Sequence, residues 1–426
     1  MAADSIIGGK NDAEAKWLTQ EAIPAFEKQM KAQGKNVTVK FQGSGLSGQD
    51  YANQLALDLK AGSGPDVFDL DGPYYGEFAQ AGYLKPLNQL VPSEATWSGW
   101  AQIPKSVQAI TEFNGQQYGI PGGTDGRVLY YNKQLFQKAG LPTDWHPSSW
   151  ADILSAARQL KAKDPGIEAL QIDGGSNMGE ATTLQGFLPI LAGAGKLIYD
   201  ESTSKWQGNT PAMQAAAGFY HTIYSEGLSN SELQLGANGR NQTFQLFSQG
   251  KVGIYLESTY MWESVIAPES TALYPMSNRN QDVGYTLLPA QNPGSGIKGQ
   301  NFVSMSGGGG ETMNPHAKNP QLAWDLLTFL NSKSSILQYE QIKPYISARE
   351  DVNAVALATH PLENFVATKV LPITAYRPSL GIYPQVSVAI QDLAQSLATG
   401  TPVSKALQAY TATLDKTVGA TNVSSS

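Results

Sequence analysis

Residues 37–71 read VTVKFQGSGLSGQDYANQLALDLKAGSGPDVFDLD, and this stretch decides the fold. Residues 37–41 alternate between apolar and polar, which is typical of a half-buried strand, and residues 66–70 are predicted to form the next strand. A helix is predicted over residues 51–61, because its apolar residues recur at helical spacing. These residues are Tyr51, Leu55 and Leu59. A strand, a helix and a second strand in this order indicate a parallel α/β sheet.

The alternation of predicted strands and helices continues on both sides of this stretch. Residues 5–9 (SIIGG) predict an earlier strand that ends in glycine. A helix is expected from about Asp12, with an apolar inner face at Trp17, Leu18, Ile23 and Phe26. Further along, Ser149 resembles a helix N-cap, and Pro320 is placed to open another helix. Residues 252–256 are predicted to form a strand that ends beside Glu257.

Length and composition exclude several classes of protein. A chain of 426 residues is too long for one ordinary core, so two domains are expected. A net charge of −7 argues against nucleic acid as a partner, and the lack of cysteine excludes disulfides and thiolate metal sites. No apolar run reaches the ~20 residues of a membrane span. The first residues lack a signal-peptide pattern, so the protein is either cytoplasmic or has lost its leader.

Residues 43–48 (GSGLSG) match the glycine pattern of dinucleotide-binding proteins, after a predicted strand and before a predicted helix. However, that strand is the second of the predicted sheet, and short glycine patterns arise often in a chain with 43 glycines. A simpler interpretation is a ligand-binding loop at the carboxyl end of a strand. Gln42 and Ser44 would then supply its polar groups.

The sequence can be compared with the residue patterns of three kinds of enzyme: serine hydrolases, metalloenzymes and glycoside hydrolases. Serine-hydrolase and metal chemistry find no support, because the chain has no G-x-S-x-G turn and its four histidines are far apart. A glycoside hydrolase stays open, because paired carboxylates carry that reaction. Sugar binding uses the same residue types, so composition does not separate the two. The candidate carboxylates are Asp66, Asp69, Asp71 and Glu257.

Aromatic residues follow two of these carboxylates. Tyr74 and Tyr75 come after Asp71, and Tyr260 and Trp262 come after Glu257. Sugar hydroxyls donate hydrogen bonds to carboxylates, while the apolar face of a pyranose ring packs on an aromatic ring. Both segments are therefore predicted to bind carbohydrate, with Trp262 as the stacking residue.

Several segments in order along the chain resemble the extracellular solute-binding proteins of carbohydrate ABC importers, the maltose-binding-protein-like family. The match extends from about Ile6 to Lys416. The segments that carry it are GPDV at 64–67, FAQAGYLKPL at 78–87, YGIP at 118–121, LYYNKQLFQKAGL at 129–141, the F-x-x-G-K strand from Phe247, the glycines at 307–310 and the helix at 320–330.

The resemblance implies an α/β, periplasmic-binding-protein-like fold with two lobes, a multi-segment hinge and a ligand in the cleft. Lobe 1 would comprise residues 1–122 and 289–335, and lobe 2 would comprise residues 127–285 and 336–426. The hinge would lie near residues 122–127, 287–293 and 372–384.

The resemblance also implies a function without catalysis and without a cofactor or metal. The protein would bind a neutral di- to tetrasaccharide and deliver it, by lobe closure, to the permease subunits of an ABC transporter. It would be a monomeric cell-surface lipoprotein or periplasmic protein whose signal and lipid anchor have been removed. A glycoside hydrolase and a receptor for a non-sugar solute are the alternatives. The implied ligand contacts are Lys10, Asn11, Gln42, Ser44, Asp71, Tyr74, Tyr75, Thr124, Asp125, Arg127, Ser176, Asn177, Glu257, Tyr260, Trp262, Gly308, Gly309, Arg377 and Tyr383.

Overall fold

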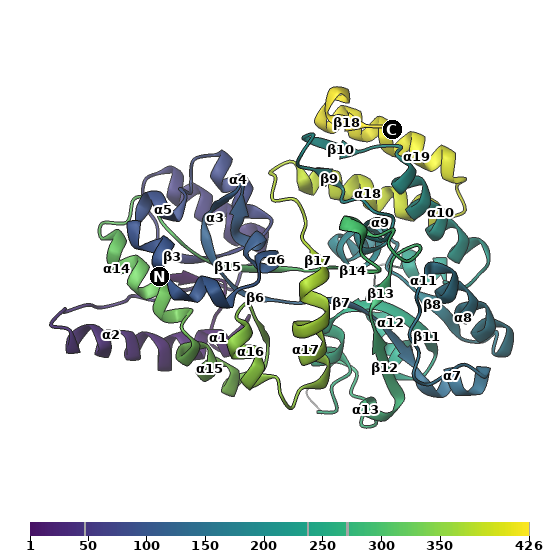
Figure 1. Cartoon of the computed structure of the whole chain (residues 1–426), viewed down its shortest axis with the longest axis horizontal. Coiled ribbons are helices and arrows are strands. Elements are labelled where there is room, and N and C mark those ends of the chain that lie inside the picture. Colours follow the sequence, from purple (N-terminus) through teal and green to yellow (C-terminus); the bar gives the residue numbers. More distant parts are fainter. Residues whose placement is uncertain (47, 237, 270–271, 426) are drawn as a thin grey trace. The chain divides into compact units, whose positions relative to one another are not determined.

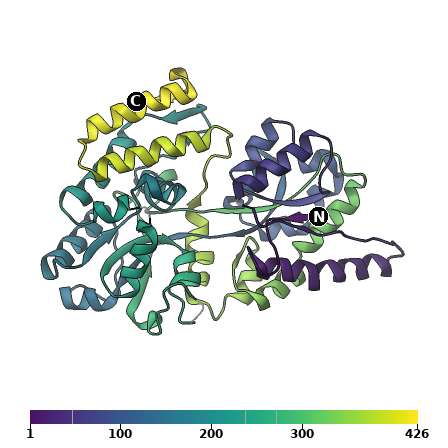
Figure 2. The same cartoon turned by 180° about the vertical axis from the view of Figure 1, so that it is seen from behind.

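The computed structural model describes residues 1–46, 48–236, 238–269 and 272–425 (Figures 1 and 2). The chain forms two compact units. Unit 1 consists of Met1–Thr124, Gly307–Thr368 and Ser379–Gly381, and unit 2 consists of Asp125–Ser306, Lys369–Pro378 and Ile382–Ser426. Both units combine helices with strands, so the predicted α/β class is confirmed. Within the described ranges, no helix has the length and apolar character needed to cross a membrane.

Unit 1 is built on a six-stranded sheet in the order β16-β6-β15-β3-β1-β2. Strands β1, β2 and β3 are parallel, and β15 runs antiparallel to both β3 and β6. The carboxyl ends of β1, β3 and β6 therefore meet at one edge of the sheet. The bounds are β1 (Ala2–Ala3), β2 (Gln42–Gly43), β3 (Val67–Asp71), β6 (Gly119–Thr124), β15 (Gly308–Met313) and β16 (Ile346–Ser347), beside a hairpin of β4 (Glu112–Phe113) and β5 (Gln116–Gln117).

Helices cover both faces of this sheet, with α3 and α4 on one face and α2 and α15 on the other (Figures 1 and 2). The predicted stripe of α3 is confirmed, because Tyr51, Leu55 and Leu59 pack in one buried cluster with Phe68 and Leu70. The inner face expected after Asp12 is also buried. The helices are α1 (Asp12–Trp17), α2 (Ile23–Ala32), α3 (Gly48–Lys60), α4 (Tyr74–Gln80), α5 (Leu87–Leu90), α6 (Lys105–Gln108), α14 (Pro320–Leu330), α15 (Lys333–Ile342), α16 (Glu350–Ala356) and α17 (Pro361–Phe365).

Two predicted strands of unit 1 are wrong. Residues 5–9 form a turn, in which the Ile6 N–H donates to Lys10 O and Gly8 adopts a φ of 76°. The strand of this region is β1, which lies upstream. Residues 37–41 lie outside the sheet, and β2 follows them. Pairing of β1 with β3 and of β2 with β1, rather than local alternation, selects these two-residue strands. Ser47 of the glycine pattern lies outside the described residues.

Unit 2 contains a four-stranded sheet in the order β12-β7-β11-β8, and two three-stranded sheets in the orders β13-β14-β17 and β18-β10-β9. The predicted strand at residues 252–256 is confirmed as β11, which extends to Ser258. The bounds are β7 (Arg127–Asn132), β8 (Glu168–Gln171), β9 (Tyr199–Asp200), β10 (Lys205–Gln207), β11 (Val252–Ser258), β12 (Val283–Thr286), β13 (Leu288–Pro289), β14 (Phe302–Met305), β17 (Thr374–Ala375) and β18 (Val423–Ser424).

Side-chain caps begin helices α7, α8, α10 and α11 of unit 2. Ser149 accepts a hydrogen bond from the Asp152 N–H, which confirms the predicted N-cap of α8. In unit 1, Pro320 opens α14 as expected, with Asn319 as the cap. The helices of unit 2 are α7 (Lys133–Ala139), α8 (Trp150–Lys163), α9 (Leu188–Gly193), α10 (Pro211–Ser225), α11 (Ser231–Leu235), α12 (Gly239–Ser248), α13 (Arg279–Asp282), α18 (Tyr383–Ala398) and α19 (Val403–Val418).

The two units divide the chain differently from the predicted lobes. Residues 289–306 belong to unit 2, because β14 pairs there with β13 and β17. Residues 336–368 belong to unit 1, where β16 pairs with β6 and Tyr339 packs on Trp17 with ring centroids 5.2 Å apart. The chain passes between the units after Thr124, Ser306, Thr368, Pro378 and Gly381. The passage after Ser306 replaces the one predicted near residues 287–293.

Candidate functional site

A cavity of about 400 Å³ opens in unit 1 where β1, β3 and β6 end. The register explains its position, because Asp71 at the end of β3 pairs with Gly309 near the start of β15. Open α/β sheets bind their ligands at the carboxyl ends of parallel strands. The lining residues are Asp4, Asn11, Glu14, Tyr51, Ala52, Asp69, Leu70, Asp71, Tyr74, Gly122, Gly123, Gly308, Gly309, Gly310 and Glu311.

Carboxyl groups dominate the polar lining of this cavity. The Asp4 N–H donates to both carboxylate oxygens of Asp69, at 3.0 Å each. Burial raises the pKa of Asp69 to about 7, and burial together with the Asp69 charge raises the pKa of Glu14 to about 8. Burial also raises the pKa of Glu311, which accepts a hydrogen bond from Asn331 at 3.0 Å. Near neutral pH Asp69 and Glu14 therefore share protons, and each can accept or donate a hydrogen bond.

Lys10 and Asn11 lie at the same edge of the sheet. The Lys10 ammonium pairs with Asp4 and donates to Leu46 O at 2.9 Å. Asn11 adopts a φ of 49° before α1, and its side-chain amide donates to Asp4 O at 2.8 Å. Both side chains therefore hold the loop after β1 that carries Asp4.

The glycines of β15 allow three backbone segments to pack closely beside the cavity. A Cβ atom on Gly309 would lie 2.6 Å from Leu70 O, and one on Gly310 would lie 2.2 Å from Ile120 O. Gly308 has a φ of 135°, a backbone conformation that residues with a Cβ atom rarely adopt. These residues are needed for strand packing, whether or not their backbone contacts a ligand.

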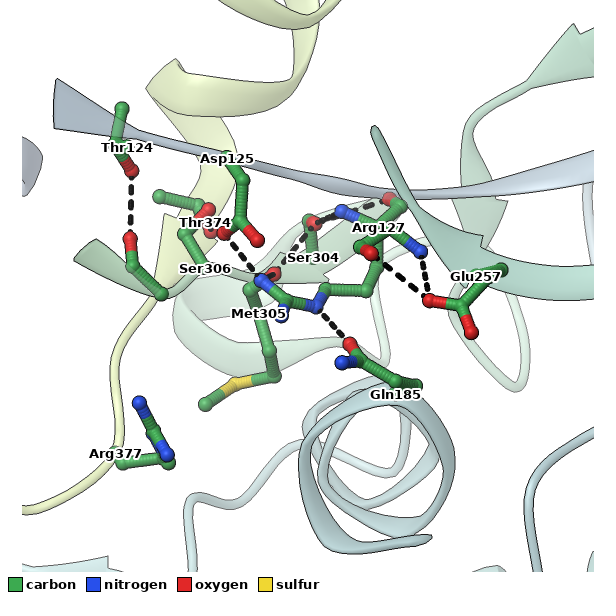
Figure 3. Close-up of polar contacts among 12 residues, drawn as sticks. Thr124, Asp125, Arg127, Gln185, Glu257, Ser304, Met305, Ser306, Thr374 and Arg377 are labelled. Atoms are coloured by element: carbon green, nitrogen blue, oxygen red, sulfur yellow. Dashed lines mark hydrogen bonds and ion pairs between the residues drawn. The ribbon is translucent and has the colours of Figure 1, made fainter. Parts of the chain in front are cut away.

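In unit 2, Arg127 forms the centre of a buried polar network (Figure 3). Its guanidinium donates to the carboxylate of Asp125 and to Gln185 Oε1, each at 2.5 Å. Its backbone N–H donates to Ser304 Oγ at 3.0 Å, and that hydroxyl lies 3.0 Å from Arg127 O. The network fixes the Asp125 carboxylate at the start of β7.

Glu257 lies in the interior of unit 2, where Arg240 holds it. The guanidinium donates to both Glu257 oxygens, at 2.8 and 3.0 Å, and lies 3.6 Å from Asp173. Tyr255 Oη donates to Asp173 at 3.0 Å. Burial and the neighbouring Glu257 charge raise the pKa of Asp173 to about 7. Glu257, a predicted ligand contact, is therefore a carboxylate that already forms two hydrogen bonds with Arg240.

Trp262, the predicted stacking residue, is packed among other side chains of unit 2. It is only 4% exposed, and the Arg279 guanidinium lies 3.8 Å from its ring centroid. Tyr285 meets it edge-on, with centroids 5.5 Å apart. Its neighbour Tyr260 is 46% exposed. Tyr260 therefore offers the more accessible ring of this segment.

The remaining predicted contacts of unit 2 also take part in hydrogen bonds within that unit. Ser176 Oγ donates to Gln395, and the Asn177 side chain donates to Leu235 O at 2.8 Å. Arg377 and Tyr383 both donate to Glu180, at 3.1 and 2.6 Å.

The sequence profile of bacterial extracellular solute-binding proteins matches residues 10–335, which is well over half of the chain. The chain belongs to this family. Its members are the substrate-binding proteins of ABC transporters, and these are not enzymes. The resemblance found in the sequence is therefore confirmed.

Similar proteins of the family are named for sugars. The chain is 26% identical over 352 residues to the galactooligosaccharide-binding protein of Bacillus subtilis, with 79% of this chain and 72% of that protein covered. It is 25% identical over 257 residues to a maltooligosaccharide ABC transporter solute-binding lipoprotein of Streptococcus pneumoniae, with 58% and 53% covered. The structure of the sugar-binding protein MalE of Xanthomonas citri superimposes with a TM-score of 0.77 at 18% identity, with 98% and 96% covered. This similarity places the solute-binding protein in the periplasmic-binding-protein-like fold.

Some of the residues predicted as ligand contacts in unit 1 line the cavity of this solute-binding protein, and others do not. Asn11, Asp71, Tyr74, Gly308 and Gly309 line it. The other predicted residues of the unit are not among its described lining. Tyr75 is buried in the core, where its hydroxyl donates to Gly310 O at 2.9 Å. Gln42 and Ser44 belong to β2 and its following loop, and Thr124 Oγ1 donates to Gly307 O at 2.9 Å.

Sequence reasoning missed most of the carboxyl lining. Asp4, Glu14 and Glu311 were not considered, and Asp69 was considered only as part of a hydrolase. The spacing of Asp69 and Asp71 in β3 was the one available indication, because both belong to the same short run. Nothing in the sequence places Glu311 beside them, since it comes from a distant strand.

Proposed function

We propose that this protein binds an oligosaccharide outside the cell and passes it to a cognate ABC importer. The observation that carries the proposal is the cavity of unit 1, which is lined by carboxyl groups and by Tyr74. Carboxylates accept hydrogen bonds from sugar hydroxyls, and a tyrosine ring packs on the apolar face of the sugar. The galactooligosaccharide and maltooligosaccharide relatives support a ligand of the same class.

Delivery is the second part of the proposal. Binding would favour a closed arrangement of the two units, and the permease subunits of the importer would recognise that form. We propose a monomer that acts at the cell surface as a lipoprotein or in the periplasm. The name of the Streptococcus pneumoniae relative supports the lipoprotein form.

Calorimetry with a panel of mono- to tetrasaccharides tests the binding function. We expect saturation at one site with a dissociation constant of about micromolar or lower, because a few well-placed hydrogen bonds and one stacking contact supply about 8 kcal/mol. The same panel tests the neutral di- to tetrasaccharide predicted from the sequence. If no sugar in the panel produces heat or shifts the melting temperature, the carbohydrate function is rejected.

A product assay separates binding from hydrolysis. After long incubation with each bound sugar, chromatography should recover the intact sugar. Release of monosaccharide by the pure protein, and its loss in Asp71→Asn, would instead support the glycoside hydrolase.

Two aromatic variants test which ring of the segment at β11 contacts the sugar. We expect Tyr260→Ala to weaken binding by about 1–3 kcal/mol, as a stacking residue does, with a change in stability below about 1 kcal/mol. Trp262→Ala should instead lower the free energy of unfolding by about 3 kcal/mol, because it removes a buried aromatic side chain. Binding enthalpies and urea denaturation measure the two effects. Normal affinity in Tyr260→Ala, with weak binding by a folded Trp262→Ala, would return the stacking role to Trp262.

A further inference from the structure

The charged groups that line the cavity of unit 1 are all acidic in the part of the chain that the structure describes. They are Asp4, Glu14, Asp69, Asp71 and Glu311. The ammonium group of Lys10 is already bound to Asp4. Coulomb repulsion among Asp4, Glu14, Asp69 and Glu311 adds to burial in raising the pKa of Asp69 and Glu14. Among the described residues no cationic side chain lines the cavity, so shared protons rather than a cation offset the charge of Glu14 and Asp69.

Two oxygen atoms at the cavity accept no hydrogen bond from the residues that the structure describes. Tyr51 lines the cavity and is only 7% exposed, and its hydroxyl interacts with the Asp69 carboxyl group while its oxygen accepts no hydrogen bond from the described residues. Asp4 Oδ1 also accepts no hydrogen bond from the described residues, while the other carboxylate oxygen of Asp4 pairs with Lys10. A buried polar atom without a partner is costly, so these two atoms indicate where a ligand would donate hydrogen bonds.

The chemistry of the lining limits the ligand group that would satisfy it. An anionic sugar would be repelled by the carboxylates. A metal ion is not favoured, because no group of three or more His, Cys, Asp or Glu among the described residues could hold one. A neutral hydroxyl donates a single hydrogen bond and brings no positive charge. An ammonium group donates three hydrogen bonds and carries the missing positive charge.

We propose that the cavity of unit 1 receives a protonated amino group, so that the bound carbohydrate contains an amino sugar. Asp4 Oδ1 and the Tyr51 hydroxyl oxygen would accept from the ammonium group, and Glu14, Asp69 and Glu311 would supply the surrounding negative charge. Tyr74 is placed to pack against the ring that bears the amine. This inference rests on the proposed carbohydrate-binding function and narrows its ligand to a cationic sugar in place of a neutral one.

Matched pairs of sugars test the inference by calorimetry at neutral pH. Each pair contains a neutral sugar and its 2-amino counterpart: glucose and glucosamine, galactose and galactosamine, cellobiose and the β-1,4-linked glucosamine disaccharide. We expect the amino member of at least one pair to bind about tenfold or more tightly than its neutral member, and N-acetylation to remove that advantage.

The outcomes of this experiment are separable. If neutral sugars bind as tightly as their amino counterparts, the amino-sugar inference is overturned and the carbohydrate function stands. If no sugar binds, the carbohydrate function fails, and the inference fails with it. Binding of spermidine without any sugar would likewise overturn both and point to a polyamine receptor.

Charge-neutral variants connect the effect to the cavity. Glu14→Gln and Asp69→Asn keep the side-chain shape and remove one carboxyl group each. We expect either variant to weaken binding of the amino sugar by about tenfold and so to reduce the preference for the amino member of the pair. Glu340→Gln is the matched control, because burial raises the pKa of Glu340 to about 7 in the same unit and its side chain is outside the cavity lining. Equal losses in the control and the cavity variants, at unchanged melting temperature, would contradict the assignment.

Discussion

Replacing Arg240 by methionine should lower the free energy of unfolding by about 3–5 kcal/mol. The expectation follows from burial, because the side chains of Glu257 and Asp173 are 0% exposed and share this guanidinium. Methionine keeps much of the side-chain volume and removes the charge, so two buried carboxyl groups lose their cation. Urea denaturation followed by circular dichroism and tryptophan fluorescence measures the loss.

The loss of unfolding free energy in Arg240→Met should increase as the pH rises. The folded-state pKa of Asp173, about 7, lies above the ordinary aspartate value of 3.8 that it has in the unfolded chain. Its contribution is therefore most favourable below the unfolded pKa, and it is lost as the pH rises through the folded one. Removal of Arg240 raises the folded pKa further, so the deficit of the variant should be larger at about pH 8 than at about pH 5.

A surface pair gives the matched control for this prediction. Arg158 also binds a glutamate with two hydrogen bonds, at 2.7 and 2.8 Å to Glu226, but the two side chains are 51% and 38% exposed. Arg158→Met should therefore cost less than about 1 kcal/mol. Combining Arg240→Met with Glu257→Gln should recover part of the loss. A deficit for Arg240→Met that is small and independent of pH would show that the buried carboxyl groups do not need this cation.

The features that local sequence predicts well are those that a single element determines. The buried stripe of α3, the Ser149 cap of α8 and the opening of α14 at Pro320 each depend on residues within a few positions of one another. β1 and β2 show the opposite case. These strands consist of two residues each, and their place in the sheet depends on pairing with strands that are distant in the chain. Local alternation therefore placed both strands a few residues away from their actual positions.

The candidate site shows the same division between local and distant determinants. The Asp71–Tyr74 segment follows a recognisable strand, and both residues line the cavity. Glu257 has the same local pattern, yet Arg240 from helix α12 converts it into an internal ion pair. A carboxylate near the end of a strand can line a binding cavity or form an internal ion pair. A partner residue from another element decides which of the two occurs.

Replacing Gly310 by alanine should be the most damaging single methyl addition in the sheet of unit 1. An added Cβ would lie 2.2 Å from Ile120 O and 2.8 Å from Thr111 Cγ2, both far inside contact distance. The nearest obstacle is backbone of the paired strand β6, so relief requires β15 and β6 to separate. We expect a loss of about 3 kcal/mol in the free energy of unfolding, with weaker sugar binding because Gly310 also lines the cavity.

Gly122 supplies the control from the same sheet and the same cavity. An added Cβ there would lie 3.4 Å from the Glu311 carboxyl oxygen, which is ordinary contact with the movable end of a side chain. Gly122→Ala should therefore change stability by less than about 0.5 kcal/mol. Urea denaturation and binding should be measured on both variants. Gly310→Ala tests contact with backbone, and Gly122→Ala tests contact with a movable side chain beside the same cavity. If Gly310→Ala is as stable as Gly122→Ala, then β15 has room to move, and close packing of the strands cannot be the reason for glycine at this position.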